Sequence, residues 1–596
     1  MTGAGRAAGP CYLGMRIRSA AIVLALALTA GCRADRPAPS GATAPGQAST
    51  EWFTDHAKDA GLDFVHFNGM SGEFYYPEIM PPGVALFDYD NDGDLDVFIV
   101  QGQMLGNKPI GAAQPQPRGP LPLKGRLFRN DLQVAADGTR TLRFTDVTEA
   151  SGIVTRGYAM GVATGDFNND GCVDLYVTEL GRNQLFRNNC DGTFTDVSKA
   201  SHTDDDGWSI SAAFVDYDRD GWLDLFVGNY LNYSLEANIH CFSMSGSLDY
   251  CPPHVYRPHP SHLYHNNRDG TFTDVTVAAG MSREFGPALG VSTADFNNDG
   301  WIDIYVANDG QPNQLWINQH NGTFKNTALL SGAALSPEGE AKSSMGVDAG
   351  DFDNDGDEDL FITELTGQGD DLYVNDGSGV FEDRSARAGI RLPSLPFTGF
   401  GTGWFDFDND GWLDVVTVNG SVTQNIDALA RNEPFSLQQR KQVFRNLGNG
   451  RFEDVTKQAG AVFQIPEVSR GLAFGDIDND GDVDLVVGND SGPIRLLINN
   501  VGNRKHWVGL RLLGGKPGRD MVGARVAVTR ADGVTLWRRS RADGSYASAS
   551  DPRVLAGLGD SNTPPNVRVI WPDGRSEEWK SVPVDRYTTL REGDGH

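Results

Sequence analysis

"DFNNDGCVDLYV", from Asp166 to Val177, holds the pattern that decides the fold. Side-chain oxygens stand at positions 1, 3, 5 and 9 of a nine-residue loop, glycine stands at position 6, and strand-forming residues follow. The pattern D-x-[DN]-x-D-G-x-x-D occurs seven times in the chain. We number the copies loops 1 to 7, and they begin at Asp88, Asp166, Asp216, Asp295, Asp351, Asp406 and Asp476.

Each loop lies between two predicted strands. Around loop 2, the small-residue run GVATG (161–165) precedes it and VDLYVT (173–178) follows it. Two further short runs come next, NQLFRNN (183–189) and, after a glycine turn, TFTDVS (193–198). Four short strands in each of seven repeats predict an all-β fold, a seven-bladed β-propeller.

The seventh repeat lacks its fourth strand, because IRLLINN (494–500) continues directly into VGNRKHW (501–507). The missing pattern occurs instead before the first repeat, at Trp52–Asp55. We therefore predict that this N-terminal strand completes the seventh blade and closes the propeller, which removes an exposed sheet edge. A small all-β C-terminal domain should follow the propeller.

The oxygen spacing of the loops predicts calcium, which takes six to eight oxygen ligands in flexible geometry, whereas magnesium prefers to keep several waters. Two carboxylates 4 Å apart repel by about 4 kcal/mol at an effective dielectric constant of 20, so these loops need a cation. A metal-free Asx-rich turn is the alternative, and seven complete copies argue against it. We predict up to seven Ca²⁺ ions. The predicted ligands are Asp88, Asp90, Asp92, Asp94 and Asp96; Asp166, Asn168, Asp170 and Asp174; Asp216, Asp218, Asp220 and Asp224; Asp295, Asn297, Asp299 and Asp303; Asp351, Asp353, Asp355 and Asp359; Asp406, Asp408, Asp410 and Asp414; and Asp476, Asp478, Asp480 and Asp484. Loops 2 and 4 carry Asn168 and Asn297 at position 3, so they should bind more weakly than loops 1, 5 and 7.

The N-terminal region predicts export. Two arginines precede an apolar stretch at 20–30, which is shorter than the about 20 residues that a membrane-spanning helix needs. A linker rich in proline, alanine and serine follows at 33–50. The formal net charge of −29 argues against nucleic acid and anionic membrane surfaces as partners. The expected domains are a signal peptide (1–32), the linker (33–50), the propeller (51–502) and the C-terminal domain (503–596).

The sequence LTAGC (28–32) resembles the signal of bacterial lipoproteins, which implies lipidation of Cys32 and membrane attachment only through that anchor. Thr29 stands where such signals usually have leucine, so plain secretion after cleavage near Ala30 is the alternative. Arg33 implies the outer membrane, if the organism has one. In an exported chain, Cys241 and Cys251 predict a disulfide, while the sequence leaves open whether Cys172 and Cys190 pair.

Three other groups of residues suggest functions. His254, His259, His262 and His265 suggest a zinc or haem site, but alignment with NQLFRNN places His262 and His265 at ordinary strand positions on opposite faces. The sequence shows neither G-x-S-x-G nor H-E-x-x-H, so no catalytic residue is predicted.

The long insertions at 101–124, 230–260 and 421–441 are the predicted recognition loops. Trp222, Trp301 and Trp412 stand at position 7 of their loops, where packing between blades is expected and sugar stacking is the alternative.

The repeats resemble the FG-GAP or VCBS repeats of integrin α-subunit propellers and exported bacterial proteins. NRKHWVGLRLLG (503–514), DMVGARVAV (520–528), DGSYASASDPRVLAGLG (543–559) and VRVIWPDGRSEEW (567–579) resemble the ASPIC/UnbV domain of the cartilage acidic protein-like family. The resemblance implies an extracellular, calcium-binding protein that acts in adhesion or protein binding, and it offers no catalytic residues. Alternation in the last stretches predicts a core of Val526, Val528, Val567, Val569 and Trp571.

We therefore predict an exported, calcium-binding β-propeller that is not an enzyme. It would act as a cell-surface binding or adhesion scaffold for a protein or glycan. The alternative is a propeller-based hydrolase or lyase with its site at the central channel. A purely structural role within a surface complex is a third possibility.

Overall fold

The computed structural model describes residues 51–596 except 120, 244–245, 425–436 and 516–517. The predicted signal peptide, Cys32 and the linker lie outside the described residues. Strands make up most of the regular structure. Among the described residues, no helix has both the length and the apolar character needed to cross a membrane.

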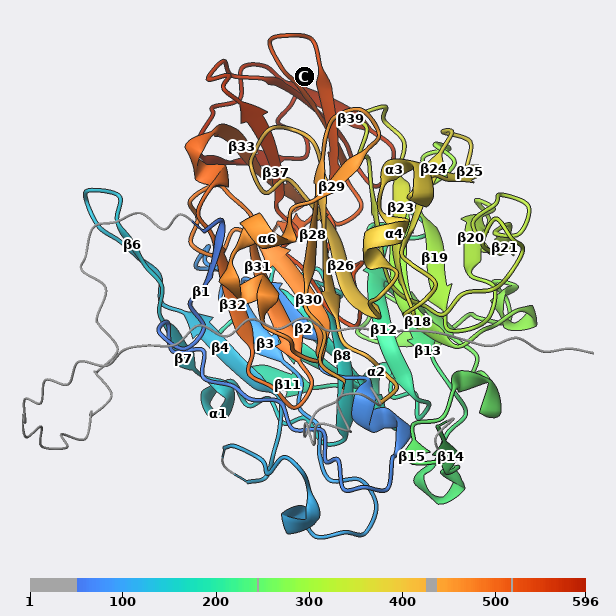
Figure 1. Cartoon of the computed structure of the whole chain (residues 1–596). Coiled ribbons are helices and arrows are strands. Elements are labelled where there is room, and N and C mark those ends of the chain that lie inside the picture. The colour runs from blue at the N-terminus through green and yellow to red at the C-terminus, as the bar shows by residue number, and fades with distance from the viewer. Residues whose placement is uncertain (1–50, 120, 244–245, 425–436, 516–517) are drawn as a thin grey trace, which may run out of the picture. The chain divides into compact units, whose positions relative to one another are not determined.

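Each repeat folds as a four-stranded antiparallel sheet, and we number the sheets 1 to 7 after the loop that each contains (Figure 1). In sheets 1 to 6 the strand order follows the chain, and the loop joins the first strand to the second. Sheet 1 contains β2 (Val84–Phe87), β3 (Asp96–Ile99), β4 (Arg126–Asn130) and β7 (Phe144–Asp146); sheet 2 contains β8 (Tyr158–Gly165), β9 (Asp174–Leu180), β10 (Gln184–Asn188) and β11 (Phe194–Asp196); sheet 3 contains β12 (Ser209–Val215), β13 (Asp224–Asn229), β16 (His262–Asn266) and β17 (Phe272–Asp274); sheet 4 contains β18 (Ala288–Ala294), β19 (Asp303–Asn308), β20 (Gln314–Asn318) and β21 (Phe324–Asn326); sheet 5 contains β22 (Ser344–Gly350), β23 (Asp359–Glu364), β24 (Asp371–Asn375) and β25 (Phe381–Asp383); sheet 6 contains β26 (Gly399–Phe405), β27 (Asp414–Asn419), β28 (Gln442–Asn446) and β29 (Phe452–Asp454).

Sheet 7 joins the two ends of the repeat region. It contains β30 (Ser469–Gly475), β31 (Asp484–Asn489) and β32 (Arg495–Asn499), and its fourth strand is β1 (Phe53–Asp55). Phe53 lies opposite Asn499 in this antiparallel pair. The pairing is the one expected from the sequence for the N-terminal strand.

The first strands of successive sheets contact one another, and β30 of sheet 7 also contacts β2 of sheet 1. Glycine permits these close approaches. A Cβ atom on Gly161 of sheet 2 would lie 2.4 Å from the carbonyl oxygen of Ile210 in sheet 3. A Cβ atom on Gly471 of sheet 7 would lie 2.6 Å from the carbonyl oxygen of Pro82, just before sheet 1. The small residues that precede each loop in the sequence are therefore the residues that let the sheets pack.

The C-terminal residues form two further sheets. One has the order β34-β33-β37, with β40 parallel to β33, and the other has the order β36-β35-β38-β39. The residues predicted as the core, Val526, Val528, Val567, Val569 and Trp571, are all buried in one apolar cluster. The strands are β33 (His506–Gly514), β34 (Arg519–Asp520), β35 (Arg525–Thr529), β36 (Thr535–Arg539), β37 (Val554–Gly559), β38 (Asn566–Ile570), β39 (Ser576–Trp579) and β40 (Tyr587–Arg591).

Single helical turns and two small hairpins complete the described elements. Several of the turns follow the fourth strand of a sheet directly, as α1 follows β7. The elements are α1 (Thr148–Ser151), α2 (Ser198–Ser201), α3 (Ser385–Ala388), α4 (Arg391–Ser394), α6 (Thr456–Ala459), the 3-10 turns η1 (Tyr76–Ile79), η2 (Ile110–Ala112), η3 (Leu235–Ala237), η4 (Pro253–Val255), η5 (Met281–Arg283), η6 (Ala461–Gln464) and η7 (Gly502–Arg504), and the hairpins β5 (Gln133–Val134) with β6 (Arg140–Thr141) and β14 (Cys241–Phe242) with β15 (Leu248–Asp249).

Candidate metal centres

Loops 1 to 7 share one backbone geometry, which loop 2 illustrates. Asp166 at position 1 accepts the backbone N–H groups of Asp170 (3.1 Å) and Gly171 (2.8 Å), so its carboxylate folds the loop around itself. Asp174 at position 9 accepts the N–H groups of Asn188 (2.7 Å) and Phe167 (3.1 Å), which fixes the loop to the third strand. The glycines at position 6 have φ between +84° and +100°, a region that glycine adopts without steric cost. The predicted ligands of each loop are thus gathered at one end of their sheet.

Position 3 holds carboxylate oxygens that no protein group satisfies in four of the loops. In loops 1, 5, 6 and 7 its Oδ1 atom is buried and has no hydrogen-bond partner, although buried polar atoms in proteins are normally paired. In loop 2, the amide of Asn168 instead donates to Asp170 at 2.8 Å, and in loop 4 the amide of Asn297 donates to Asp299 at 2.8 Å. An oxygen-only ion such as calcium fits the loops with the unpaired oxygen. The unpaired oxygens belong to Asp90, Asp353, Asp408 and Asp478.

The carboxylates at position 1 lie in surroundings that disfavour their ionised form. Burial, followed by the charge of Asp410, raises the pKa of Asp406 to about 8. Burial also raises the pKa of Asp351 to about 7 and that of Asp88 to about 6, although Arg511 partly offsets the shift at Asp88. A bound divalent cation would supply the positive charge that these carboxylates need to stay ionised at neutral pH.

Position 4, which the repeat pattern left unspecified, links each loop to the next. Its residue has φ between +52° and +60° in all seven loops, and it is asparagine in six of them and Arg219 in loop 3. The asparagine amide usually donates to the position 6 carbonyl of the following loop, and loop 7 returns to loop 1. We call this set of contacts the asparagine girdle. Its donors and acceptors are Asn91 to Gly171 (3.0 Å), Asn169 to Gly221 (3.0 Å), Asn354 to Gly411 (3.2 Å), Asn409 to Gly481 (2.8 Å) and Asn479 to Gly93 (3.4 Å).

The two exceptions in the girdle still bridge neighbouring loops. Asn298 of loop 4 donates to the carboxylate of Asp357 in loop 5 at 2.6 Å. The guanidinium of Arg219 lies 4.3 Å from the ring centroid of Trp301 in loop 4. Trp301 also stacks on His320 at 4.9 Å, so this tryptophan packs between neighbouring repeats, as expected. The recurrence of asparagine at position 4 was the sequence signal that could have revealed the girdle.

Arginines of the C-terminal sheets contact the loops from outside the repeats. Each guanidinium reaches a carboxylate or a backbone carbonyl of a loop, so the C-terminal residues add positive charge where the loops are most acidic. The contacts are Arg511 to Asp88 Oδ2 (3.4 Å), Arg525 to the Gly356 carbonyl (2.5 Å), Arg538 to the Gly411 carbonyl (3.1 Å) and Arg553 to the Asp476 carbonyl (2.9 Å).

Residues 543–550, which we call the central segment, touch the first strand of every sheet. The side chain of Tyr546 is fully buried against Phe400, with ring centroids 4.9 Å apart, and its hydroxyl donates to the carbonyl of Met80 at 3.1 Å. Small serine and alanine residues let the segment pass between the strands. In order from sheet 1 to sheet 7, its contacts are Val84 N to Ser548 Oγ (3.2 Å), Val162 N to Ala547 O (3.0 Å), Ala547 N to Ser211 Oγ (3.0 Å), Thr293 N to Asp543 Oδ2 (2.5 Å), Val347 N to Ser545 O (3.0 Å), Thr402 N to Ser545 Oγ (3.3 Å) and Phe474 N to Ser550 Oγ (3.3 Å).

The structure forms both disulfides that the sequence considered. Cys241 is joined to Cys251, and Cys172 is joined to Cys190, the pair that the sequence left open. The second bridge ties loop 2 to the turn after its third strand.

His262 and His265 contact different groups of acids. His262 pairs with Asp274 at 2.9 Å, whereas Nδ1 of His265 lies 3.2 Å from Asp224 and 3.4 Å from Asp218 in loop 3. His262 and His265 lie in β16 at the register positions of Gln184 and Arg187 in β10, as the alignment predicted. The alignment did not show that the third strand passes directly beside the loop, which lets His265 reach loop 3.

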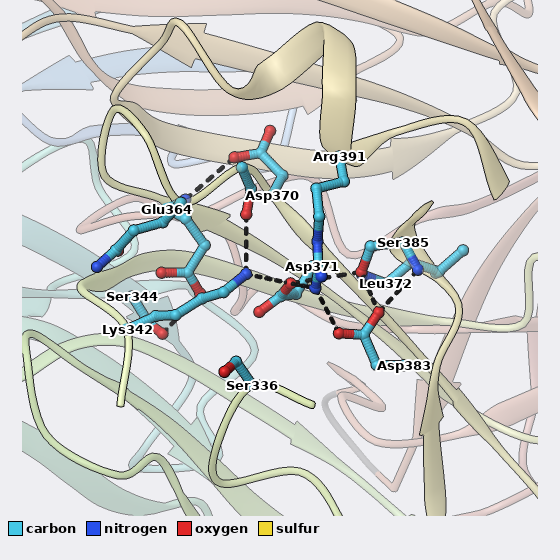
Figure 2. A network of polar contacts seen from close by, with 12 residues as sticks. Ser336, Lys342, Ser344, Glu364, Asp370, Asp371, Leu372, Asp383, Ser385 and Arg391 are labelled. Atoms are coloured by element: carbon cyan, nitrogen blue, oxygen red, sulfur yellow. Dashed lines mark hydrogen bonds and ion pairs between the residues drawn. The ribbon is translucent and has the colours of Figure 1, made fainter. Parts of the chain in front are cut away.

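A separate group of carboxylates lies in sheet 5, and Figure 2 shows its network. Lys342 donates to Asp371 at 2.5 Å, and Arg391 bridges Asp371 (3.0 Å) and Asp383 (2.6 Å). Ser344 donates to one oxygen of the fully buried Glu364, and the other oxygen has no partner. Burial, followed by the charge of Asp371, raises the pKa of Glu364 well above its usual range. Because an ammonium group already sits among these acids, we interpret the network as structural.

The comparisons with known proteins agree with this repeat structure. The model described as FG-GAP-like repeat matches residues 166–227, 254–306, 295–362, 351–417 and 426–487. The model described as ASPIC and UnbV matches residues 514–596. The chain is an FG-GAP-like repeat protein with a C-terminal ASPIC and UnbV domain. Its all-β, β-propeller-like fold follows from the repeats.

Cartilage acidic protein 1 of Xenopus tropicalis is 30% identical to the chain over 204 residues, which are 31% of this chain and 28% of that protein. The chain thus matches little more than a quarter of that relative's length. Two solved structures are also similar. An Agrocybe aegerita lectin specific for non-reducing terminal N-acetylglucosamine covers 64% of this chain and 90% of its own, with 16% identity and a TM-score of 0.35. An exotype rhamnogalacturonan lyase covers 71% of this chain and 90% of its own, with 10% identity and a TM-score of 0.27.

Proposed function

We propose that the chain is an exported, calcium-binding, seven-bladed β-propeller that acts as a binding scaffold for a protein or glycan partner. The observation that carries the proposal is the asparagine girdle around loops that contain buried, unpaired carboxylate oxygens. Calcium would satisfy those oxygens and hold each loop in the geometry that its neighbour contacts. The predicted signal peptide and the lipid anchor at Cys32 would place the scaffold at the cell surface.

Three contacts support a closed ring of seven blades. The girdle returns from Asn479 of loop 7 to Gly93 of loop 1. Strand β30 contacts β2, and β1 completes sheet 7. The central segment reaches the first strand of each of the seven sheets, which is the arrangement expected when those strands surround a common axis. Closure would leave none of these sheets with an unprotected edge.

The recognition surface in this proposal lies at the ends of the strands, on the side of the sheets opposite the loops. The loops precede the second strand of a sheet, and the long insertions of sheets 1, 3 and 6 follow it, so the two sets occupy opposite ends of the strands. The insertions meet around the segment that contains η1. Tyr250 donates to Glu78 at 3.0 Å, Asn238 donates to the carbonyl of Glu73 at 3.2 Å, and the backbone of Gln424 donates to Asp249 at 3.2 Å.

Exposed apolar side chains on these insertions favour a protein over a glycan as the partner. Phe242 is 64% exposed at the disulfide-bridged hairpin, and Leu121 is 61% exposed on the insertion of sheet 1. Apolar residues that a scaffold exposes on its loops are candidates for contacts with a protein partner.

The described residues support the hydrolase or lyase alternative less than they support a binding scaffold. The position expected for its site is the channel along the axis, and there Tyr546, Phe400 and the central segment pack against the first strands. A substrate would have to displace this packing.

The test is a binding screen against purified surface proteins and a glycan array, in calcium and in chelator. We expect calcium-dependent binding that Phe242→Ser reduces at least about tenfold. Val134→Ser is the matched control, because Val134 is also exposed (58%) but lies on the β5–β6 hairpin. Binding that is insensitive both to chelator and to Phe242→Ser would refute the proposal.

A further inference from the structure

Loop 3 differs from its sisters in ways that change which ion it can hold. We propose that loop 3 is a transition-metal site, formed by His265, Asp218 and Asp224, which takes a zinc-like divalent ion in preference to calcium. The inference goes beyond the calcium function proposed above, since it concerns one loop and another class of metal.

The imidazole nitrogen of His265 supplies the first observation. Nδ1 lies 3.2 Å from Oδ1 of Asp224 and 3.4 Å from Oδ2 of Asp218, and yet this buried atom forms no hydrogen bond. One oxygen or nitrogen atom from each of the three side chains falls within 4.8 Å of the others. Zinc binds histidine nitrogen at about 2.0–2.1 Å and carboxylate oxygen at about 2.0–2.2 Å, so two ligands of a tetrahedral zinc ion lie about 3.4 Å apart. The separations around Nδ1 match that value.

Asp224 supplies a second, independent observation. The residue is fully buried, and its Oδ2 atom has no hydrogen-bond partner. In loop 2, the equivalent Oδ2 atom of Asp174 accepts the backbone N–H of Phe167 at 3.1 Å. Loop 3 therefore keeps a buried carboxylate oxygen without a partner at position 9, as loop 5 does at Asp359, and only loop 3 sets a histidine beside it. Such an oxygen is costly unless a cation or a proton satisfies it.

The ligand set of loop 3 suits zinc better than calcium. Arg268 donates to Oδ2 of Asp220 from Nε at 2.9 Å, which occupies the position 5 carboxylate. Calcium needs six to eight oxygen ligands and gains little from imidazole, whereas imidazole with carboxylates suits zinc and its neighbours in the first transition row. The His265 side chain remains 29% exposed, so the site lies close to the protein surface although Nδ1 itself is buried.

The sister strands provide matched variants. Arg129, Arg187 and Arg445 occupy the position of His265 in sheets 1, 2 and 6, so His265→Arg introduces a residue that these sheets already accept and removes the nitrogen ligand. Gln184 occupies the position of His262 in sheet 2, so His262→Gln is the control on the same strand.

The test uses the full chain, purified without a histidine tag and freed of metal. Zn²⁺ is titrated calorimetrically in millimolar calcium, and Co²⁺ is followed by its visible spectrum, whose intense bands report tetrahedral coordination. We expect one zinc per chain in the wild type and in His262→Gln, with affinity at least about 100-fold lower in His265→Arg.

Three results would overturn the proposal: zinc binding that survives His265→Arg, zinc binding that calcium displaces, or zinc binding that disappears in His262→Gln. Weak zinc binding without a fixed stoichiometry, which indicates an adventitious ion only, would also overturn it. Calcium uptake by the other loops is measured separately in the same samples. If loop 3 binds no zinc, the calcium proposal is therefore still tested independently by the calcium measurement.

Discussion

Asn409 is the residue through which loop 6 holds loop 7, so its removal tests the girdle directly. Its amide donates to the carbonyls of Gly481 (2.8 Å) and Gly502 (3.0 Å), and the residue is fully buried with φ of +52°. Asn409→Ala removes two hydrogen bonds, worth about 1 kcal/mol each. It also places a residue with a Cβ in the left-handed region without the compensation that asparagine provides, at about 1 kcal/mol. We therefore expect a loss of about 3 kcal/mol in the free energy of unfolding.

Two variants separate these contributions, and the assay is equilibrium urea unfolding in saturating calcium, followed by tryptophan fluorescence. Asn409→Gly also loses the hydrogen bonds but tolerates the backbone conformation, so it should be about 1 kcal/mol more stable than Asn409→Ala. Asn91→Ala is the control in loop 1, because Asn91 occupies the same position but is exposed, and it should cost about half as much. If Asn409→Gly is as stable as the wild type, so that Asn409→Ala costs only its backbone strain, the girdle hydrogen bonds do not hold the loops together.

Three further predictions concern charge. Lys342→Met should lower the free energy of unfolding by about 2–3 kcal/mol in a urea titration, because Asp371 then keeps only Arg391 as a cation among the buried acids. The same change at the exposed Lys505 should have almost no effect. Burial raises the pKa of Glu78 to about 8. In the folded state Glu78 therefore keeps a proton that the unfolded chain loses above its ordinary pKa, and the free energy of unfolding should fall as pH rises from about 5 to 8. Glu78→Gln should remove this contribution and stabilise the protein at pH 8 by a few kcal/mol, whereas an unchanged pH profile would show that the carboxyl is not buried as described. Asn168→Asp adds a carboxylate to loop 2 and should raise its calcium affinity in a calorimetric titration, and weaker binding would contradict the assignment of position 3 as a ligand.

The repeats and the loops were predictable because each uses a local signal. Alternating strand formers, a glycine with positive φ and regularly spaced aspartates all lie within a few residues of one another, so loop 2 alone contains the whole pattern. The pairing of Trp52–Asp55 with the last repeat was predictable for a related reason: one repeat lacked a strand pattern, and one spare copy of it existed.

The contacts between repeats were not predictable from the pattern alone. His265 lies 41 residues after Asp224, and only the register of β13 with β16 shows that its side chain reaches loop 3. Tyr546 is far from every repeat in sequence, and nothing in its serine- and alanine-rich surroundings indicates burial between the first strands. Such contacts depend on how whole sheets pack against one another, and this packing cannot be inferred from a short stretch of sequence.

The number of calcium ions bound per chain decides whether loops 1 to 7 are metal centres. The metal-free full chain is equilibrated with calcium, bound ions are counted by native mass spectrometry, and the melting temperature is measured in calcium and in chelator. The calcium assignment predicts six or seven calcium ions per chain and a large fall in melting temperature on chelation, since each filled site adds about 2.7 kcal/mol when calcium exceeds its dissociation constant 100-fold. Fewer than two bound ions, with the same melting temperature in both buffers, would contradict it.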